Sequence, residues 1–374
     1  MDDTLHSGSK LSEHEVLRYS RHLQLPQVGA TGQLRLKSAH AVVVGCGGLG
    51  APVAQYLAAA GVGCLTLIDG DVVELSNLQR QVTFSEQDIG LPKSEQTQKR
   101  LQALNSDIDI SAVSQHLNVD NAEALIASAD IVLDCTDNFA ARYLINDVCK
   151  LKQLPWAYAS IHQFSGQMAL FEAQGPCFRC LFPQPPANVQ NCSAAGVLGV
   201  LPGILGTLQA AEALKYLLGM PLSLASKLMM VEVTDMLFQS FSLTQSDDCV
   251  SCAGLEHLNK HSEFYNAQCG QDSMSVSTTE IPAAQFLETA ADDSNALLID
   301  VRNPTEHAAF NLGGTNVPLD QLSDWLETKD RDQPLLFYCQ IGARSNKACE
   351  RATELGFSSK NLRGGINAYL ADKL

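Results

Sequence analysis

The residues with the clearest chemical signature in this chain are two pairs of cysteines. Cys177 and Cys180 form one Cys-x-x-Cys pair, and Cys249 and Cys252 form a second. Four thiolates on two such knuckles are a common ligand set of a closed, tetrahedral zinc site. A redox-active pair or unrelated core cysteines are the alternatives. Because the spacing is duplicated, we predict one structural Zn²⁺ per chain.

Cys339 has a different setting, since it directly follows the apolar run 335–338 and precedes a helical pattern. Such a loop surrounds a sulfur with backbone N–H donors and a helix N-terminus, which stabilise a thiolate or persulfide anion. Arg344 adds a cation. A buried core cysteine is the alternative, and the cysteine loops of phosphatases are usually one residue longer. The predicted persulfide loop comprises Gln340, Ile341, Gly342, Ala343, Arg344 and Ser345.

A third kind of thiol is Cys192, which follows a proline-rich stretch at 183–186. A loop thiol close to an activated carboxyl group can attack it and form an acyl-enzyme or acyl-persulfide link. A loop cysteine without a role is the alternative.

A glycine-rich turn follows the first predicted strand and opens a helix, the context in which such turns bind phosphate. Asp69 ends the next strand, about twenty residues further on, where an acid binds ribose hydroxyls. Taken alone, these features favour a nicotinamide dehydrogenase. The turn consists of Gly45, Cys46, Gly47, Gly48, Leu49 and Gly50.

Polar and basic residues after the second strand favour nucleotidyl transfer over hydride transfer. A site that cleaves a triphosphate must stabilise charge on the leaving pyrophosphate, which a hydride-transfer site does not need. Two carboxylates, Asp134 and Asp137, end a later strand and suit Mg²⁺ beside phosphate. The predicted ATP-binding residues beyond the glycines, Leu49 and Asp69 are Asp71, Ser76, Asn77, Leu78, Gln79, Arg80, Lys93, Asp137 and Asn138.

Alternating strands and helices must position these residues. Apolar runs at 41–44, 64–68 and 131–133, with a helix at 52–60, predict an α/β, doubly wound, mostly parallel sheet whose ligands bind beyond the strand ends. The uncharged stretch 196–211 contains proline and glycines, so we expect a buried helix in a large core or dimer interface rather than a membrane span.

A second, smaller α/β unit follows a polar segment. Strands are predicted at 297–300 and 335–338 and a helix at 345–355. We therefore expect an adenylating domain at 1–253, a linker at 254–277 and a small domain at 278–374.

The net charge and the cysteine content indicate which partners and which cellular compartment to expect. The 374-residue chain has a net charge of −16, which argues against nucleic acid but not against ATP, whose phosphates are bound by local groups. Its N-terminus has no apolar signal segment, and twelve cysteines without one indicate a reducing, cytoplasmic compartment. We expect neither a nucleic acid nor a membrane partner.

Several of these motifs together resemble the molybdopterin-synthase and thiazole-synthesis adenylyltransferases, which are relatives of ubiquitin-activating enzymes. The resemblance spans about residues 14–252 and includes the glycine-rich turn, 76–81, Lys93, 135–138 and the arginines at 18 and 21. It implies a zinc element, ribose binding by Asp69, and Mg²⁺ binding by Asp137. It also implies that Asn77, Arg80 and Lys93 bind the phosphates of ATP, and that Arg21 reaches ATP from the partner subunit of a homodimer.

Residues 278–374 resemble a rhodanese domain in the Cys339 loop and in the stretches 298–304, 316–319 and 362–365. The resemblance implies that Cys339 carries a persulfide, and relatives with such a unit have a cysteine at the place of Cys192. Residues 310–312 read Phe-Asn-Leu where a Gly-His-Ile type of sequence is expected, so local packing of that loop is expected to differ.

Together the two units predict a single pathway. We expect adenylation of the Gly-Gly C-terminus of a ubiquitin-like sulfur carrier protein with Mg-ATP, then sulfur transfer from Cys339 to give a thiocarboxylate. The sulfur donor is thiosulfate or a cysteine desulfurase persulfide. Molybdenum cofactor, thiamin, cysteine and tRNA thiolation pathways all remain open. The alternatives are a rhodanese with a carrier-binding, non-adenylating first domain, and a scaffold that uses ATP for stability.

Overall fold

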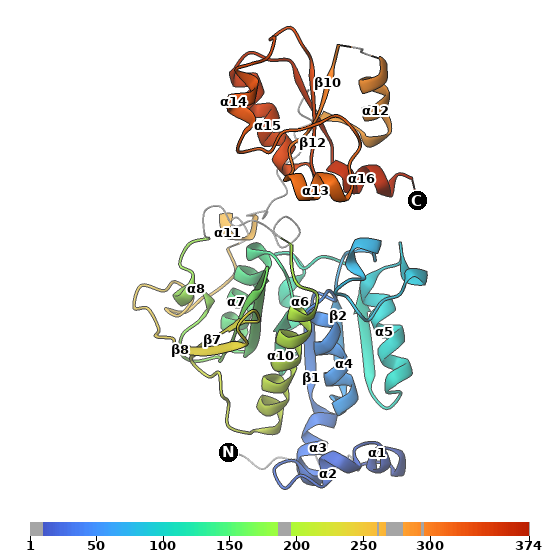
Figure 1. Ribbon diagram of the computed structural model, residues 1–374. Coiled ribbons are helices and arrows are strands. Elements are labelled where there is room, and N and C mark those ends of the chain that lie inside the picture. The colour runs from blue at the N-terminus through green and yellow to red at the C-terminus, as the bar shows by residue number, and fades with distance from the viewer. Residues whose placement is uncertain (1–9, 186–195, 260–261, 267–279, 293–294, 374) are drawn as a thin grey trace. The chain divides into compact units, whose positions relative to one another are not determined.

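The chain divides into two compact units with a boundary at residues 270 and 271. A computed structural model describes residues 10–185, 196–259, 262–266, 280–292 and 295–373 (Figure 1). The boundary falls inside the segment predicted as a linker. The predicted limits of the domains and of that linker stay a prediction.

The first unit is built on an eight-stranded sheet in the order β3-β2-β1-β4-β5-β6-β7-β8. The first five strands in this order pair in parallel, and β5 to β8 pair antiparallel. The sheet is thus less parallel than expected, because only two residues separate the paired His162 and Ser165 and the chain must reverse there. The strands are β1 (His40–Val44), β2 (Cys64–Ile68), β3 (Asp109–Val113), β4 (Ile131–Asp134), β5 (Trp156–His162), β6 (Ser165–Phe171), β7 (Lys227–Glu232) and β8 (Leu237–Ser242).

Helices cover both faces of this sheet, which confirms the doubly wound expectation. Successive residues of a strand point to opposite faces. Ala41 and Val43 of β1 join the core with α4 and α10, whereas Val42 and Val44 join the core with α6 and α7. The helices of this unit are α1 (Glu13–Arg18), α2 (Ser20–Leu23), α3 (Gly29–Ser38), α4 (Gly50–Ala60), α5 (Lys93–Leu104), α6 (Ala122–Ile126), α7 (Phe139–Lys152), α8 (Phe178–Leu181), α10 (Val200–Leu218) and α11 (Glu263–Asn266), with 3₁₀ turns η1 (Leu75–Asn77) and η2 (Glu86–Asp88).

The uncharged stretch at 196–211 runs into α10, which packs along α4. Gly206 permits the close approach, since a Cβ there would lie 2.4 Å from the carbonyl oxygen of Leu49 at the start of α4. Leu201 and Leu205 are fully buried, as expected for a core helix. Within the described residues, no helix combines the length and apolar character needed to cross a membrane.

The second unit contains a five-stranded sheet in the order β11-β10-β12-β13-β9, with every neighbouring pair parallel. One face packs against α14 and α15, and the other against α12 and α16. Both predicted strands are present, and the predicted helix begins two residues earlier than expected, at Ala343. The elements are β9 (Glu280–Ile281), α12 (Ala283–Asp292), β10 (Leu297–Asp300), α13 (Pro304–Ala309), β11 (Thr315–Asn316), α14 (Leu322–Leu326), β12 (Leu335–Tyr338), α15 (Ala343–Glu354), β13 (Ser359–Leu362) and α16 (Gly365–Ala371).

Candidate functional sites

The glycine-rich turn joins β1 to α4 at the carboxyl edge of the parallel strands. Gly45 has φ +95°, and a Cβ there would lie 2.7 Å from the carbonyl oxygen of Cys135. A Cβ at Gly50 would lie 1.9 Å from the carbonyl oxygen of Gly45. Only glycine fits either position without a backbone shift, so the sequence forces a tight turn that leads into the N-terminus of α4.

Asp69, at the end of β2, ties this turn to the following loop. Its Oδ2 accepts a hydrogen bond of 2.7 Å from the backbone N–H of Cys46, and its Oδ1 accepts one of 2.8 Å from that of Asp71. Burial raises the pKa of Asp69, although these two N–H donors oppose the rise. The predicted ribose-binding carboxylate therefore lies directly against the glycine-rich turn.

Several predicted phosphate-binding residues lie on the loop between β2 and α5. The ammonium of Lys93 is buried and lies 2.9 Å from the carboxylate of Asp71. Arg80 donates to the carbonyl of Ser76, at 3.0 Å, and the buried Asn77 caps η1. Local hydrogen bonds thus order this loop. Leu78 is half-buried and Gln79 exposed at the end of η1.

Arg21 lies on α2 and is exposed. In the described part of the chain, no hydrogen bond connects it with the β2–α5 loop. Its expected role across a dimer stays a prediction.

The two carboxylates at the end of β4 have different environments. Asp137 is exposed, whereas Asp134 is fully buried and burial raises its pKa to about 6. Asp134 accepts hydrogen bonds from the backbone N–H and hydroxyl of Thr136, at 3.0 and 2.7 Å. Asn138 caps α7 by accepting from the backbone N–H of Ala141, at 2.8 Å. Of the pair, only Asp137 is open to solvent and so available to a magnesium ion.

Gln209 is a positioning residue that the sequence analysis missed. From the fully buried face of α10 its amide nitrogen donates to the carbonyls of Asp134 and Ala157, at 2.7 and 2.8 Å. It therefore connects the last residue of β4 with the second residue of β5, beside the loop that carries Asp137. A glutamine within the uncharged first part of this helix was the available signal.

The four cysteines of the two knuckles converge, with their sulfur atoms all within 4.8 Å of one another. Cys177 lies 3.5 Å from Cys249 and 3.9 Å from Cys180, and Cys180 lies 3.6 Å from Cys252. Thiolates around zinc, with Zn–S bonds of about 2.3 Å, form a tetrahedron with edges of about 3.8 Å. The donor type and the spacing therefore fit a tetrahedral zinc ion.

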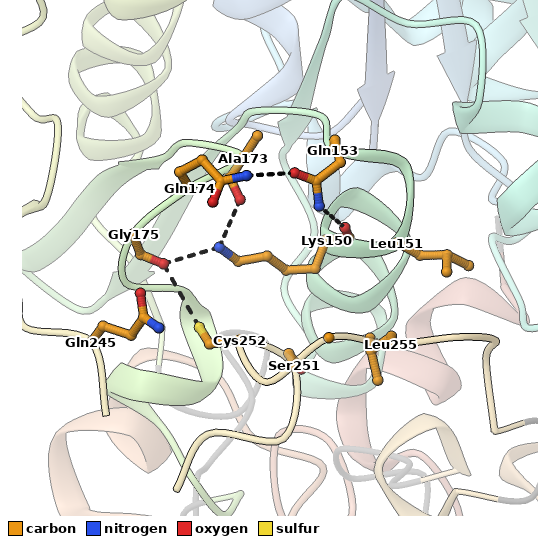
Figure 2. A pocket seen from close by; sticks show the side chains of 11 residues that line it. Lys150, Leu151, Gln153, Ala173, Gln174, Gly175, Gln245, Ser251, Cys252 and Leu255 are labelled. Carbon is orange, nitrogen blue, oxygen red and sulfur yellow. Dashed lines mark hydrogen bonds between the residues drawn. The ribbon is translucent and has the colours of Figure 1, made fainter. Parts of the chain in front are cut away.

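A hollow of about 160 Å³ lies beside this cluster (Figure 2). Lys150 extends along it and donates to the carbonyls of Ala173 and Gly175, both at 3.0 Å. The lining includes Ser251 and Cys252 but none of the residues predicted to bind ATP.

In the second unit, Cys339 is fully buried at the end of β12. Its sulfur accepts hydrogen bonds from the backbone N–H of Gly342, at 3.2 Å, and from the hydroxyl of Ser345, at 3.3 Å. Gly342 has φ +92°, which lets the loop wrap around the sulfur before α15 begins. This arrangement of donors suits a sulfur-centred anion.

Two ion pairs flank the loop. Arg302 pairs with the buried Asp300, at 2.7 Å, and also donates to the side chain of Gln340, at 2.9 Å. Burial acts to raise the pKa of Asp300, but hydrogen bonds from Arg302 and His307 outweigh it and hold that pKa below its ordinary value.

Arg344, expected as the cation of the loop, is itself paired. Its two terminal nitrogens donate to both carboxylate oxygens of Glu306, at 2.6 and 2.7 Å. In the unexpected Phe310 stretch, the carbonyl of Phe310 accepts a hydrogen bond from Arg302, at 2.5 Å. Cys192, the third predicted thiol, lies outside the described residues.

Known proteins match both units of this chain. Residues 19–251 match the ThiF family, and residues 283–372 match the rhodanese-like domain. The chain belongs to the ThiF family. The expected combination of an adenylyltransferase-type unit with a rhodanese-type unit is confirmed.

Relatives of this ThiF-family chain carry informative names. The Xenopus laevis adenylyltransferase and sulfurtransferase MOCS3 is 37% identical over 96% of this chain and 87% of its own length. The sulfur carrier protein adenylyltransferase of Thermus thermophilus is 45% identical over 69% of this chain and 98% of its own length. Among solved structures, E. coli MccB with ATP superposes with a TM-score of 0.54 at 29% identity, covering 63% of this chain and 74% of MccB.

Proposed function

We propose that this chain adenylates the C-terminal Gly-Gly carboxylate of a ubiquitin-like sulfur carrier protein and then converts it to a thiocarboxylate. It is an adenylyltransferase and a sulfurtransferase. The observation that carries the proposal is the presence of both matched units in one chain, as in relatives that bear both activities in their name and align with 96% of the sequence.

In the first step, a carboxylate oxygen of the carrier attacks the α-phosphorus of ATP. An acyl-adenylate forms and pyrophosphate leaves. Positioning and charge stabilisation supply most of the rate enhancement for such a transfer. We assign Asn77, Arg80 and Lys93 to the phosphates and Asp69 to the ribose. Asp137 would hold Mg²⁺, which neutralises charge on the phosphate oxygens when bound.

In the second step, the terminal sulfur of a Cys339 persulfide attacks the acyl carbon. AMP leaves, and the carrier is joined to Cys339 through an acyl disulfide. Release of the thiocarboxylate then requires a thiolate that attacks the sulfur of Cys339 and forms a disulfide with it. We assign that thiolate to Cys192. An external reductant must afterwards return the two cysteines to thiols.

The remaining assignments follow from the same proposal. The four-cysteine cluster holds a structural Zn²⁺ that ties residues 249–252 to residues 177–180. The protein is a cytoplasmic homodimer in which Arg21 reaches the ATP of the partner subunit. The sulfur donor is thiosulfate or a cysteine desulfurase persulfide.

A rhodanese with a non-adenylating first domain is the less favoured candidate. The 45% identity to a sulfur carrier protein adenylyltransferase covers 69% of this chain, a share that must include most of the first unit. Lys93 and Asp137 are also both present.

Intact-mass spectrometry of a Gly-Gly-ending carrier protein tests the proposal. The carrier is incubated with this protein, Mg-ATP and a sulfur donor. We expect the mass change of one oxygen replaced by sulfur, dependent on ATP and on Cys339. The Cys339→Ala variant should still form the adenylate. A carrier that gains sulfur without ATP would refute the two-step proposal.

A further inference from the structure

A buried carboxylate binds residues that lie between the cysteines of the four-cysteine cluster. Asp147, on α7, is 2% exposed. Its Oδ1 accepts from Arg179, at 2.9 Å, and from the hydroxyl of Ser251, at 2.6 Å. Its Oδ2 accepts from Arg179 again and from the hydroxyl of Tyr265, both at 2.6 Å. A carboxylate has about four lone-pair sites, so these donors nearly saturate it.

Asn146, the neighbour of Asp147 on α7, also donates to Oδ1, at 3.0 Å. The other donors come from three separate segments of the chain. Arg179 lies between the two cysteines of the first knuckle, and Ser251 lies between the two cysteines of the second. Tyr265 belongs to α11, the last described element of the first unit. Asp147 therefore joins both metal-binding knuckles to α11.

Neighbouring residues of α7 support the first knuckle. The side-chain oxygen of Asn146 accepts from the backbone N–H of Phe178, at 2.9 Å. Lys150, about one turn after Asp147, binds the carbonyls of Ala173 and Gly175 just before Cys177 (Figure 2). These side chains of α7 thus hold the first knuckle in place, and Asp147 also binds the second knuckle.

Packing fixes the guanidinium of Arg179 in one place. It stacks on the ring of Tyr143, at 4.8 Å, and on the ring of Phe264 from α11, at 4.2 Å. Removing a partner from a buried, hydrogen-bonded ion pair leaves a desolvated charge, which is costly. Arg179, Asp147 and α11 consequently stabilise one another's positions.

We propose that Asp147 is the positioning residue of the metal site and that it couples metal binding to the docking of α11. The inference rests on the zinc assignment made above. Zinc binding requires the two knuckles to be correctly placed relative to each other, and Asp147 fixes that placement through Arg179 and Ser251. Because coupling between two binding events is reciprocal, docking of α11 through Tyr265 raises zinc affinity, and bound zinc holds α11 in place.

The test uses the full-length protein and two variants, Asp147→Asn and Tyr265→Phe. Zinc affinity is measured by competition with a chromophoric chelator. Outer-sphere partners of metal ligands typically change affinity by about 10- to 100-fold, and we expect a loss of this size for Asp147→Asn. Losing one hydrogen bond to a charged group predicts a loss of about tenfold for Tyr265→Phe.

Tyr143→Phe is the matched control. The ring of Tyr143 packs against those of Phe178 and Phe264, but its hydroxyl donates to the carbonyl of Phe182, at 2.8 Å, and not to Asp147. Its zinc affinity should stay within about twofold of wild type, well below a typical outer-sphere effect. Circular dichroism verifies that each variant is folded.

Hydrogen exchange supplies the reciprocal measurement. Chelation of zinc from the wild-type protein should accelerate amide exchange at residues 262–266. A wild-type protein without one zinc per chain would overturn the zinc assignment and this inference together. If the wild-type protein does contain zinc, two results would overturn only the inference. One is an unchanged zinc affinity in the folded variants, and the other is amide exchange at residues 262–266 that does not change when zinc is chelated.

Discussion

The ammonium of Lys93 is buried at the start of α5 and lies 2.9 Å from the exposed carboxylate of Asp71. The backbone N–H of Lys93 also donates to the carbonyl of Asp71, at 2.9 Å. These two bonds fix the cation beside the loop that Asp69 ties to the glycine-rich turn. The lysine that we propose to bind phosphate is therefore held in place by Asp71.

Lys93→Met should lower carrier-dependent ATP–pyrophosphate exchange by about 10²- to 10³-fold, the usual loss when a preorganised charge-stabilising group is removed. Thiosulfate-to-cyanide sulfur transfer by the same protein serves as the control, because we expect it to depend on Cys339 in the second unit and not on Lys93. Exchange within a few-fold of wild type would exclude Lys93 from phosphate stabilisation.

Gln209→Leu should destabilise the first unit. It leaves the carbonyls of Asp134 and Ala157 buried without these donors, and each such loss costs about 1–3 kcal/mol. Urea unfolding measures the change. Gln174→Leu is the matched control, since that exposed glutamine donates only to Gln153 among the hydrogen bonds described. Equal stability of the two variants would show that the hydrogen bonds of Gln209 do not stabilise the first unit.

The pairing of Arg344 with Glu306 predicts a change in donor preference. Glu306→Gln keeps an oxygen for the backbone N–H of Asn303, which Glu306 caps at 3.0 Å, but removes the charge facing Arg344. A free guanidinium should bind a dianion better, so we expect the KM for thiosulfate to fall about threefold to fivefold, the size of a partly exposed ion pair.

The double variant Glu306→Gln, Arg344→Gln distinguishes this effect from a change in loop structure. It should lose the gain in thiosulfate affinity. If the gain survives without Arg344, the cation is not its origin.

Burial of Asp134 predicts a pH dependence of stability. Its pKa is raised to about 6 in the folded protein, above its ordinary value of 3.8. The folded state therefore binds this proton more tightly, and that contribution is complete below the ordinary value and is lost as pH rises towards 6. Relative to Asp134→Asn, wild type should lose about 2–3 kcal/mol of unfolding free energy across this interval.

Fluorescence of Trp156 reports this transition in the full chain. The two tryptophans are Trp156 in the first unit and Trp325 in the second, so a Trp325→Phe background isolates the signal. A stability difference that does not vary between pH 4 and 6 would show that Asp134 ionises normally.

Short spacings determined much of what could be predicted. The turn from Gly45 to Gly50, both cysteine knuckles and the loop after Cys339 each occupy a few consecutive residues, and their geometry follows from local backbone chemistry. Strand periodicity likewise placed β1, β2, β10 and β12, because alternating or continuous apolar runs reflect burial in a sheet.

Tertiary structure alone decided the polar contacts between distant segments. Asp147 meets Arg179, Ser251 and Tyr265 across separations of 32, 104 and 118 residues. Arg344 meets Glu306 across 38 residues, and Gln209 reaches Asp134 across 75. No periodicity records such partners, because a buried polar group is satisfied by whichever donor the fold brings near. The sequence by itself determined which chemical groups this protein carries, and folding determined which of them hold the others in position.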